Sequence, residues 1–171
     1  MRWLLGCQRS GELRELLRAR GHDAWTCDLL DAEDGSRFHF RADIRAVIRG
    51  LFWNRAIFMP ECRFLSSSGQ HHTGKPNQRT QADVDAAAGF FMALVNAPIE
   101  KIAVENSIGI MSTRYRKPDQ IVHPWMFGDD ASKATCWWLK GFPPLLPTEF
   151  IEPRWVDGKP RWANQIGRAH V

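Results

Sequence analysis

Short apolar runs alternate with segments of helical hydrophobic spacing along most of the chain. Apolar runs of four to eight residues bounded by polar turns predict buried strands. They lie at residues 2–7, 23–28, 38–42, 54–59, 101–105, 120–123 and 134–139. Helical spacing follows the first, third and fourth of these runs. The pattern therefore predicts strands joined by helices.

The first predicted helix covers residues 10–20. Ser10 has the residue type of an N-cap, and Gly21 follows the last turn. Leu13, Leu16 and Leu17 share one face, which we expect to be buried.

Capping residues also mark the starts of the other two helices. Asp43 precedes an apolar helical stretch that ends near Leu51, and Thr80 with Asp83 forms a capping-box pattern. Between them, residues 66–79 are rich in Ser, Gly, His, Asn and Gln and predict a long loop.

This alternation predicts an α/β fold with a mostly parallel, doubly wound sheet and helices on both faces. Ligands of such sheets bind at the carboxyl ends of the strands. The expected ends carry polar and reactive residues: Gly6-Cys7, Asp28, Asp43, Pro60-Glu61-Cys62 and Glu105-Asn106. We therefore expect a functional site at this edge.

Length and composition limit the class of protein. The chain has 171 residues, a size typical of one domain, and a net charge of +4 with a pI near 9.1. That charge permits a nucleic-acid partner without requiring one. No apolar run reaches the length of a membrane span, and the four cysteines contain no Cys-x-x-Cys pair. We expect a cytoplasmic protein with reduced thiols, no membrane partner and no metal site; the oligomeric state stays open.

The loop of residues 6–11 joins a strand to a helix and contains two glycines. Glycine lets a ligand approach the backbone, and an acidic residue at the end of the next strand, here Asp28, often binds ribose hydroxyls. The pair predicts a cofactor that contains adenosine. A tight turn with a helix-capping aspartate is the alternative.

Two further strand ends carry candidate catalytic groups. Cys62 is a possible nucleophile; Glu61 beside it opposes a thiolate, whereas Arg63 favours one. Glu105 is a possible acid if burial keeps it protonated. The alternatives are a small buried thiol and a structural glutamate.

Two polar segments are less specific. Arg114, Arg116 and Lys117 surround Tyr115, which fits a grip on phosphates with a stacked base, or a solvated loop. His71-His72 offers a Cys–His or metal site, but has no third ligand at a suitable spacing and is more typical of a solvated loop.

Met59-Pro60-Glu61-Cys62 and Val104-Glu105-Asn106, in this order behind the glycine loop and Asp28, resemble the DNA cytosine-5 methyltransferases. The chain is most similar to short phage and prophage proteins of that type, which have the class I methyltransferase fold. Four further phrases carry the likeness, at residues 20–30, 117–122, 124–128 and 133–141.

The resemblance implies S-adenosylmethionine as cofactor and DNA as partner. Cofactor contacts are implied for eight residues: Gly6, Ser10, Gly11, Asp28, Leu29, Asp43, Ile44 and Pro60. Cys62 would attack carbon 6 of a flipped cytosine, Glu105 would donate a proton to ring nitrogen 3, and Asn106 would hold their loop. Lys133 would contact base or phosphate.

Three departures from the family keep other functions open. Glu61 stands where the family usually has proline, the glycine loop is sparse, and there is no room for a large target-recognition domain. One alternative is a degenerate methyltransferase fold that binds nucleic acid without catalysis. Another is a related enzyme that modifies a different base or a free nucleotide.

We expect residues 1–148 to form the methyltransferase-like domain and residues 149–165 to be an extended segment of a truncated chain. Residues 166–171 match the translation of a common sequencing-adapter string, which predicts a non-native tail.

Overall fold

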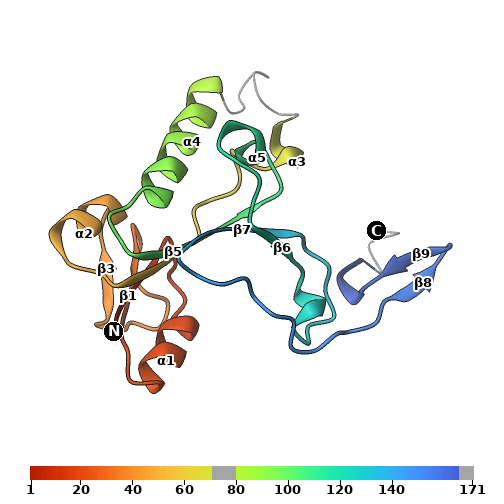
Figure 1. The fold of residues 1–171 in the computed structure, drawn as a ribbon, viewed down its shortest axis with the longest axis horizontal. Coiled ribbons are helices and arrows are strands. Elements are labelled where there is room, and N and C mark those ends of the chain that lie inside the picture. The colour runs from red at the N-terminus through yellow and green to blue at the C-terminus, as the bar shows by residue number, and fades with distance from the viewer. Residues whose placement is uncertain (71–79, 166–171) are drawn as a thin grey trace.

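A seven-stranded sheet forms the centre of the molecule (Figure 1). The structure, a computed structural model, describes residues 1–70 and 80–165. In the order in which they lie side by side, the strands are β3 (His39–Arg41), β2 (Asp23–Asp28), β1 (Arg2–Gly6), β4 (Arg55–Phe58), β5 (Lys101–Ser107), β7 (Thr135–Lys140) and β6 (Gln120–Val122). The seven predicted runs are thus all strands of one sheet.

The sheet is mixed, because β7 runs antiparallel to both of its neighbours. The pairs β3–β2, β2–β1, β1–β4 and β4–β5 are all parallel. The alternation of strands and helices predicts parallel pairing, but no long helix follows β6, so the chain turns back to form β7. The carboxyl ends of the parallel strands still meet at one edge.

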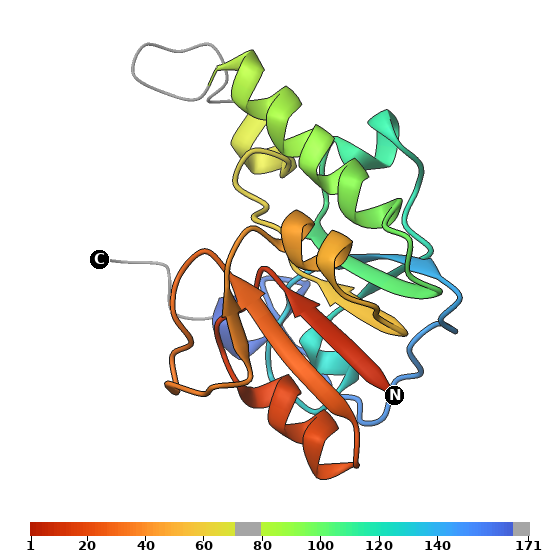
Figure 2. The same ribbon diagram turned by 90° about the vertical axis from the view of Figure 1, so that its left-hand side faces the viewer.

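Helices cover the two faces unequally (Figure 2). The helices and helical turns are α1 (Glu12–Ala19), α2 (Ile44–Gly50), α3 (Ser67–Gln70), α4 (Gln81–Val95), α5 (Met111–Arg114), η1 (Pro124–Met126) and η2 (Ala163–Gln165). The first, α1, packs beside β2 on one face, and α2 and α4 lie on the other. The main core lies under α2 and α4 and contains the buried Leu4, Phe58, Phe91, Val104 and Trp138. Burial of each such side chain contributes about 2 kcal/mol of stability.

Helix caps confirm two of the three predicted starts. The Asp43 side chain accepts a hydrogen bond from the backbone of Arg45, and Thr80 with Asp83 forms a complete capping box. The start at Ser10 is wrong, because the N-cap of α1 is Gly11 and no side chain caps it. Within the predicted loop after residue 66, α3 forms a single turn, and His71-His72 lies outside the described residues.

The buried residue of α1 is not a leucine. Leu16 is 54% exposed, and the fully buried side chain is Arg14. Its guanidinium donates to the Thr26 hydroxyl across 3.0 Å and pairs with Asp34. The predicted leucine face is therefore wrong for Leu16, whereas Leu13 and Leu17 are half-buried. Periodicity does not reveal that the loop before β3 supplies a carboxylate for an inward-facing arginine.

The chain after β7 crosses back along the molecule as an exposed strap, residues 141–150. It leads to a separate hairpin of β8 (Arg154–Val156) and β9 (Lys159–Arg161), at the right of Figure 1. A two-stranded sheet thus occupies part of the predicted extended segment.

Candidate functional site

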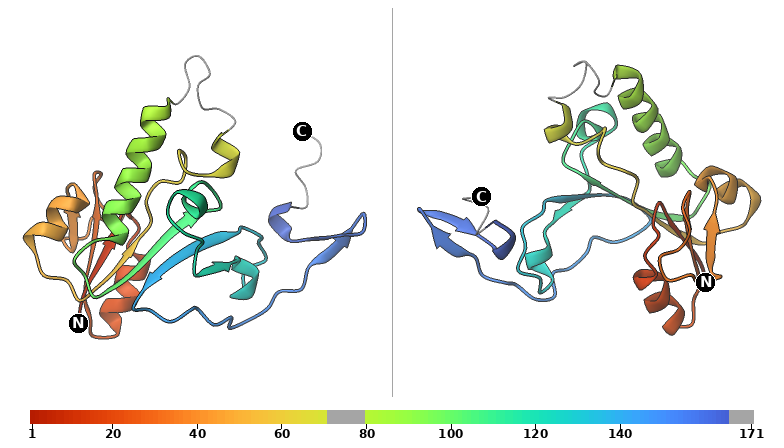
Figure 3. Two further views of the ribbon diagram at one scale, coloured as in Figure 1. Left: turned by 45° about the horizontal axis from the view of Figure 1, so that its top comes forward. Right: turned by 180° about the vertical axis from the view of Figure 1, so that it is seen from behind.

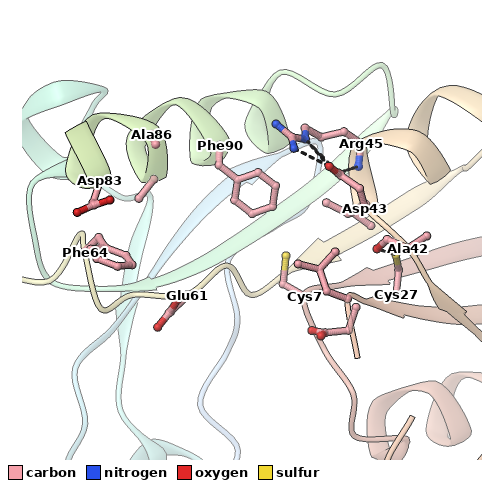
Figure 4. A pocket seen from close by; sticks show the side chains of 14 residues that line it. Cys7, Cys27, Ala42, Asp43, Arg45, Glu61, Phe64, Asp83, Ala86 and Phe90 are labelled. Carbon is pink, nitrogen blue, oxygen red and sulfur yellow. Dashed lines mark hydrogen bonds and ion pairs between the residues drawn. The ribbon is translucent and has the colours of Figure 1, made fainter. Parts of the chain in front are cut away.

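A cavity of about 600 Å³ lies at the carboxyl ends of β1, β2 and β3 and extends under α4 (Figure 4). The residues around it come from the end of β2, from the loops that follow β1, β2 and β3, from the start of α2, from the loop after β4 and from α4. They are Cys7, Cys27, Asp28, Leu29, Ala42, Asp43, Ile44, Arg45, Glu61, Phe64, Asp83, Ala86, Ala87 and Phe90. The cavity is large enough for a nucleoside-sized ligand.

Four of the predicted cofactor residues line this cavity: Asp28, Leu29, Asp43 and Ile44. One oxygen of the Asp28 carboxylate accepts a hydrogen bond from the backbone N–H of Leu30, 3.1 Å away. The Asp43 carboxylate is held by Arg45, and these hydrogen bonds lower the pKa of Asp43 to about 2. Both groups offer oxygen acceptors to a ligand.

The other four, Gly6, Ser10, Gly11 and Pro60, are not among the lining residues. Close packing explains why both Gly6 and Gly11 lack a side chain. A Cβ atom on Gly6 would lie 2.6 Å from the Phe58 ring, and one on Gly11 would collide with the Asp34 carboxylate. The glycine loop is thus a requirement of the core as well as a candidate cofactor contact.

Two cysteines, Cys7 and Cys27, also line the cavity; the sequence analysis placed Cys7 at this edge of the sheet without a cofactor role and did not assign Cys27 to it. Cys7 follows β1 with φ of 60°, in the left-handed region, and its N–H donates to the Cys27 carbonyl across 2.8 Å. Burial, and to a lesser degree the charge of Asp28, raises the pKa of each thiol to about 12. Both are neutral walls of the cavity. Their positions at the ends of adjacent strands are the signal that could have identified them.

The half of the cavity under α4 was also missed. Phe64, Asp83 and Phe90 line it together with Glu61. In the sequence, Asp83 has the pattern of a capping-box residue and Ala87 has the helical spacing of a core residue. Neither pattern shows that this end of α4 faces a cavity. The order of strands does not fix the path of the loop after β4.

Charge in the cavity is predominantly negative. Among the described residues, four carboxylates line it, those of Asp28, Asp43, Glu61 and Asp83, and Arg45 is the only cationic lining residue. Arg45 is paired with Asp43 and also lies 5.7 Å from the centre of the Phe90 ring. Such a cavity favours a cationic ligand.

The predicted catalytic residues lie on two segments that contact each other. Buried Asn106 donates through its Nδ2 to the Pro60 carbonyl, 3.0 Å away. Half-buried Cys62 follows in the same loop, and its carbonyl accepts from the N–H groups of Leu65 and Ser66. The loop of Cys62 is therefore tied to the strand that carries Glu105.

Glu105 is half-buried near the end of β5, opposite Trp137 of β7. Burial raises the pKa of its carboxyl group, and the nearby charge of Lys133 acts in the opposite direction. The fold thus brings Glu105 and Lys133 together, and it favours the protonated form that an acid catalyst requires.

The basic cluster around Tyr115 is partly neutralised. Arg114 pairs with Asp85 at 2.5 Å, and Arg116 pairs with Asp119 at 2.7 Å. Exposed Lys117 forms no ion pair with the described residues. The sequence shows the cations, but it does not show that the fold places Asp85 and Asp119 beside them.

The part of the chain that the structure describes contains no group of three or more His, Cys, Asp or Glu residues able to hold a metal ion. No helix in that part is long and apolar enough to cross a membrane.

Comparison with known proteins gives a structural match. No protein-family model matches the chain, and no curated protein matches its sequence. A crystal structure of a prophage-encoded protein of E. coli, assigned as a DNA modification methyltransferase, superposes with a TM-score of 0.52 at 13% identity. The two chains share a fold. The match covers 81% of this chain and 46% of the other, so this chain spans just under half of that protein's length.

Proposed function

We propose that this protein transfers a methyl group from S-adenosylmethionine to carbon 5 of cytosine in DNA. The observation that carries the proposal is the arrangement at one sheet edge. The acidic cavity that holds Asp28 and Asp43 borders the Pro60–Cys62 loop, and Asn106 ties that loop to the strand of Glu105. The fold shared with the prophage protein, assigned as a DNA modification methyltransferase, supports the reaction class.

The lining residues suit S-adenosylmethionine. The Asp28 carboxylate can accept hydrogen bonds from ribose hydroxyls, and Leu29 and Ile44 offer apolar surface to the adenine. The excess of carboxylates complements the positive sulfonium and ammonium groups. When bound, this cofactor supplies a methyl group on positively charged sulfur.

The chain's own residues would activate the base. The Cys62 thiolate adds to carbon 6 of a flipped cytosine, and the proton of Glu105 passes to nitrogen 3. Carbon 5 would thereby become nucleophilic toward the methyl group that the cofactor would supply from its sulfur. Water then takes the proton on carbon 5, the carbon 6–sulfur bond breaks to release the Cys62 thiolate, and the proton on nitrogen 3 returns to Glu105. Asn106 positions the loop that carries the thiol.

The test measures binding and transfer separately. Calorimetry should show that S-adenosylmethionine binds the full chain and that Asp28→Ala weakens binding at least tenfold. With tritiated cofactor and cytosine-containing DNA, the parent should label carbon 5, whereas Cys62→Ala should bind the cofactor but transfer nothing. Transfer that survives Cys62→Ala would remove the mechanism.

A second candidate is a nucleic-acid-binding module without catalysis. Glu61 lines the cavity and Cys62 does not, which favours this reading. It predicts DNA affinity that falls with salt, with no cofactor binding. A related enzyme acting on another base or a free nucleotide would be recognised by modification of that substrate with cytosine in DNA left unchanged.

A further inference from the structure

The β8–β9 hairpin is a short arm that projects away from the central sheet (Figure 3). Its turn is Asp157-Gly158, with φ of 51° and 69°. Positive φ at both central residues is the geometry of the tight turns that match strand twist. The hairpin is therefore a well-formed two-stranded ribbon.

Aromatic and ionic contacts hold the base of the hairpin in place. The Trp162 ring stacks on Trp125 with centroids 5.2 Å apart, and its Nε1–H donates to the Ile151 carbonyl across 3.0 Å. Arg154 makes two hydrogen bonds to the Asp130 carboxylate, at 3.0 and 2.6 Å. These contacts fix the direction in which the arm projects.

Strand register divides the outer part of the hairpin into two faces. Arg154 lies opposite Arg161 and Val156 opposite Lys159, whereas Trp155 lies opposite Pro160. One face thus carries three cations together with Val156, and the other carries Trp155 and Pro160. The acidic residue within the hairpin, Asp157, lies in the turn between the two strands.

Two of these cations, exposed Lys159 and half-buried Arg161, differ from the third in their ion pairing. Lys159 and Arg161 form no ion pair with any described residue, in contrast to Arg154. On the opposite face the Trp155 side chain is 71% exposed, a large apolar surface that the described fold leaves uncovered.

We propose that the β8–β9 hairpin binds duplex DNA. A two-stranded ribbon fits the major groove, and charge complementarity places Lys159 and Arg161 against the phosphates. Trp155 packs against the groove and loses its exposure to water. The choice of DNA rests on the proposed function.

The experiment measures affinity of the full chain for a labelled 24-base-pair duplex by fluorescence anisotropy, without cofactor, at several salt concentrations. Lys159→Gln/Arg161→Gln should weaken binding about tenfold and lower the slope of log affinity against log salt by about 2, because about 0.9 counterion is released per phosphate contact. Trp155→Ala should weaken binding several-fold with little change of slope.

The matched control is Arg20→Gln/Arg37→Gln, which removes the same charge at exposed positions near the opposite edge of the sheet. It should leave the slope within 0.5 of the parent value. Equal losses in the two double variants would overturn the proposal, as would a parent chain with no DNA affinity. So would a change in sedimentation on Trp155→Ala with unaltered DNA binding, because the apolar face would then be a contact between copies. Failure of methyl transfer leaves this result standing.

Discussion

The side chain of Asn106 on β5 donates a hydrogen bond to the carbonyl of Pro60 in the loop after β4. The bond joins positions 46 residues apart and is buried. It fixes the distance between the segment that carries Cys62 and the strand that carries Glu105.

Asn106→Leu keeps most of the side-chain volume and removes the donor, which leaves the Pro60 carbonyl unpaired. We expect a loss of about 2 kcal/mol in the free energy of unfolding, measured by urea denaturation. Methyl transfer should fall more than cofactor affinity. If the rate of methyl transfer and the affinity for the cofactor fell by the same factor, the hydrogen bond between Asn106 and Pro60 would serve stability alone.

Lys133 and Glu105 predict a pH dependence. Lys133→Ala removes a charge that lowers the pKa of Glu105, so that pKa should rise. If Glu105 acts as an acid, transfer falls as pH rises through its pKa, and this limb should move to higher pH in the variant. Carboxyl NMR of Glu105, assigned with Glu105→Gln, measures the same shift directly. Lys117→Ala is the control and should shift neither the pH dependence of methyl transfer nor the pKa of Glu105.

The raised pKa of Glu105 also affects stability. Between its unfolded and folded pKa values the folded chain binds more protons than the unfolded chain, so this group makes stability fall as pH rises through that window.

The left-handed backbone of Cys7 predicts an unusual order of stability. Alanine and glycine both remove the thiol, but only glycine accepts this φ without strain. We expect Cys7→Gly to be about 1 kcal/mol more stable than Cys7→Ala in chemical denaturation. At Cys27, inside β2, the order should reverse, because glycine weakens a strand.

The buried guanidinium of Arg14 predicts a large effect from a position that the sequence marks as polar. Arg14→Ala removes its packing and its bonds to Thr26 and Asp34. The free energy of unfolding should fall by about 3 kcal/mol. Arg20→Ala, on the exposed end of the same helix, should cost less than about 0.5 kcal/mol. Similar losses in the two variants would refute the burial of Arg14.

Glu61 should contribute to preference for a positively charged cofactor. Glu61→Gln removes one of four carboxylates that line the cavity, and the loss of one such charge in water-like surroundings should weaken binding of a cation about threefold. Calorimetry should show weaker binding of S-adenosylmethionine but little change for S-adenosylhomocysteine, which lacks the sulfonium charge. Glu12→Gln, on exposed α1, should change neither.

Hydrophobic spacing predicts the strands and the long helices because both depend on local periodicity. It also places Asp28 and Asp43 beside each other, since parallel strands end at one edge. Features that depend on distant partners were not predictable. The reversal of β7, the inward turn of Arg14 toward Asp34, and the ion pairs of Arg114 and Arg116 each require residues that only the folded chain brings together.

The reversal of β7 has a mechanical consequence. Because β7 ends at Lys140, opposite Ile102 at the start of β5, the chain leaves the sheet on the side away from the cavity and must return through the strap. Residues 143–150 are exposed, so within the described part of the chain a protease should cut there first. The Trp125–Trp162 stack and the Arg154–Asp130 pair lie across the cut. The nicked protein should therefore migrate as one particle in its native state and as two fragments once denatured.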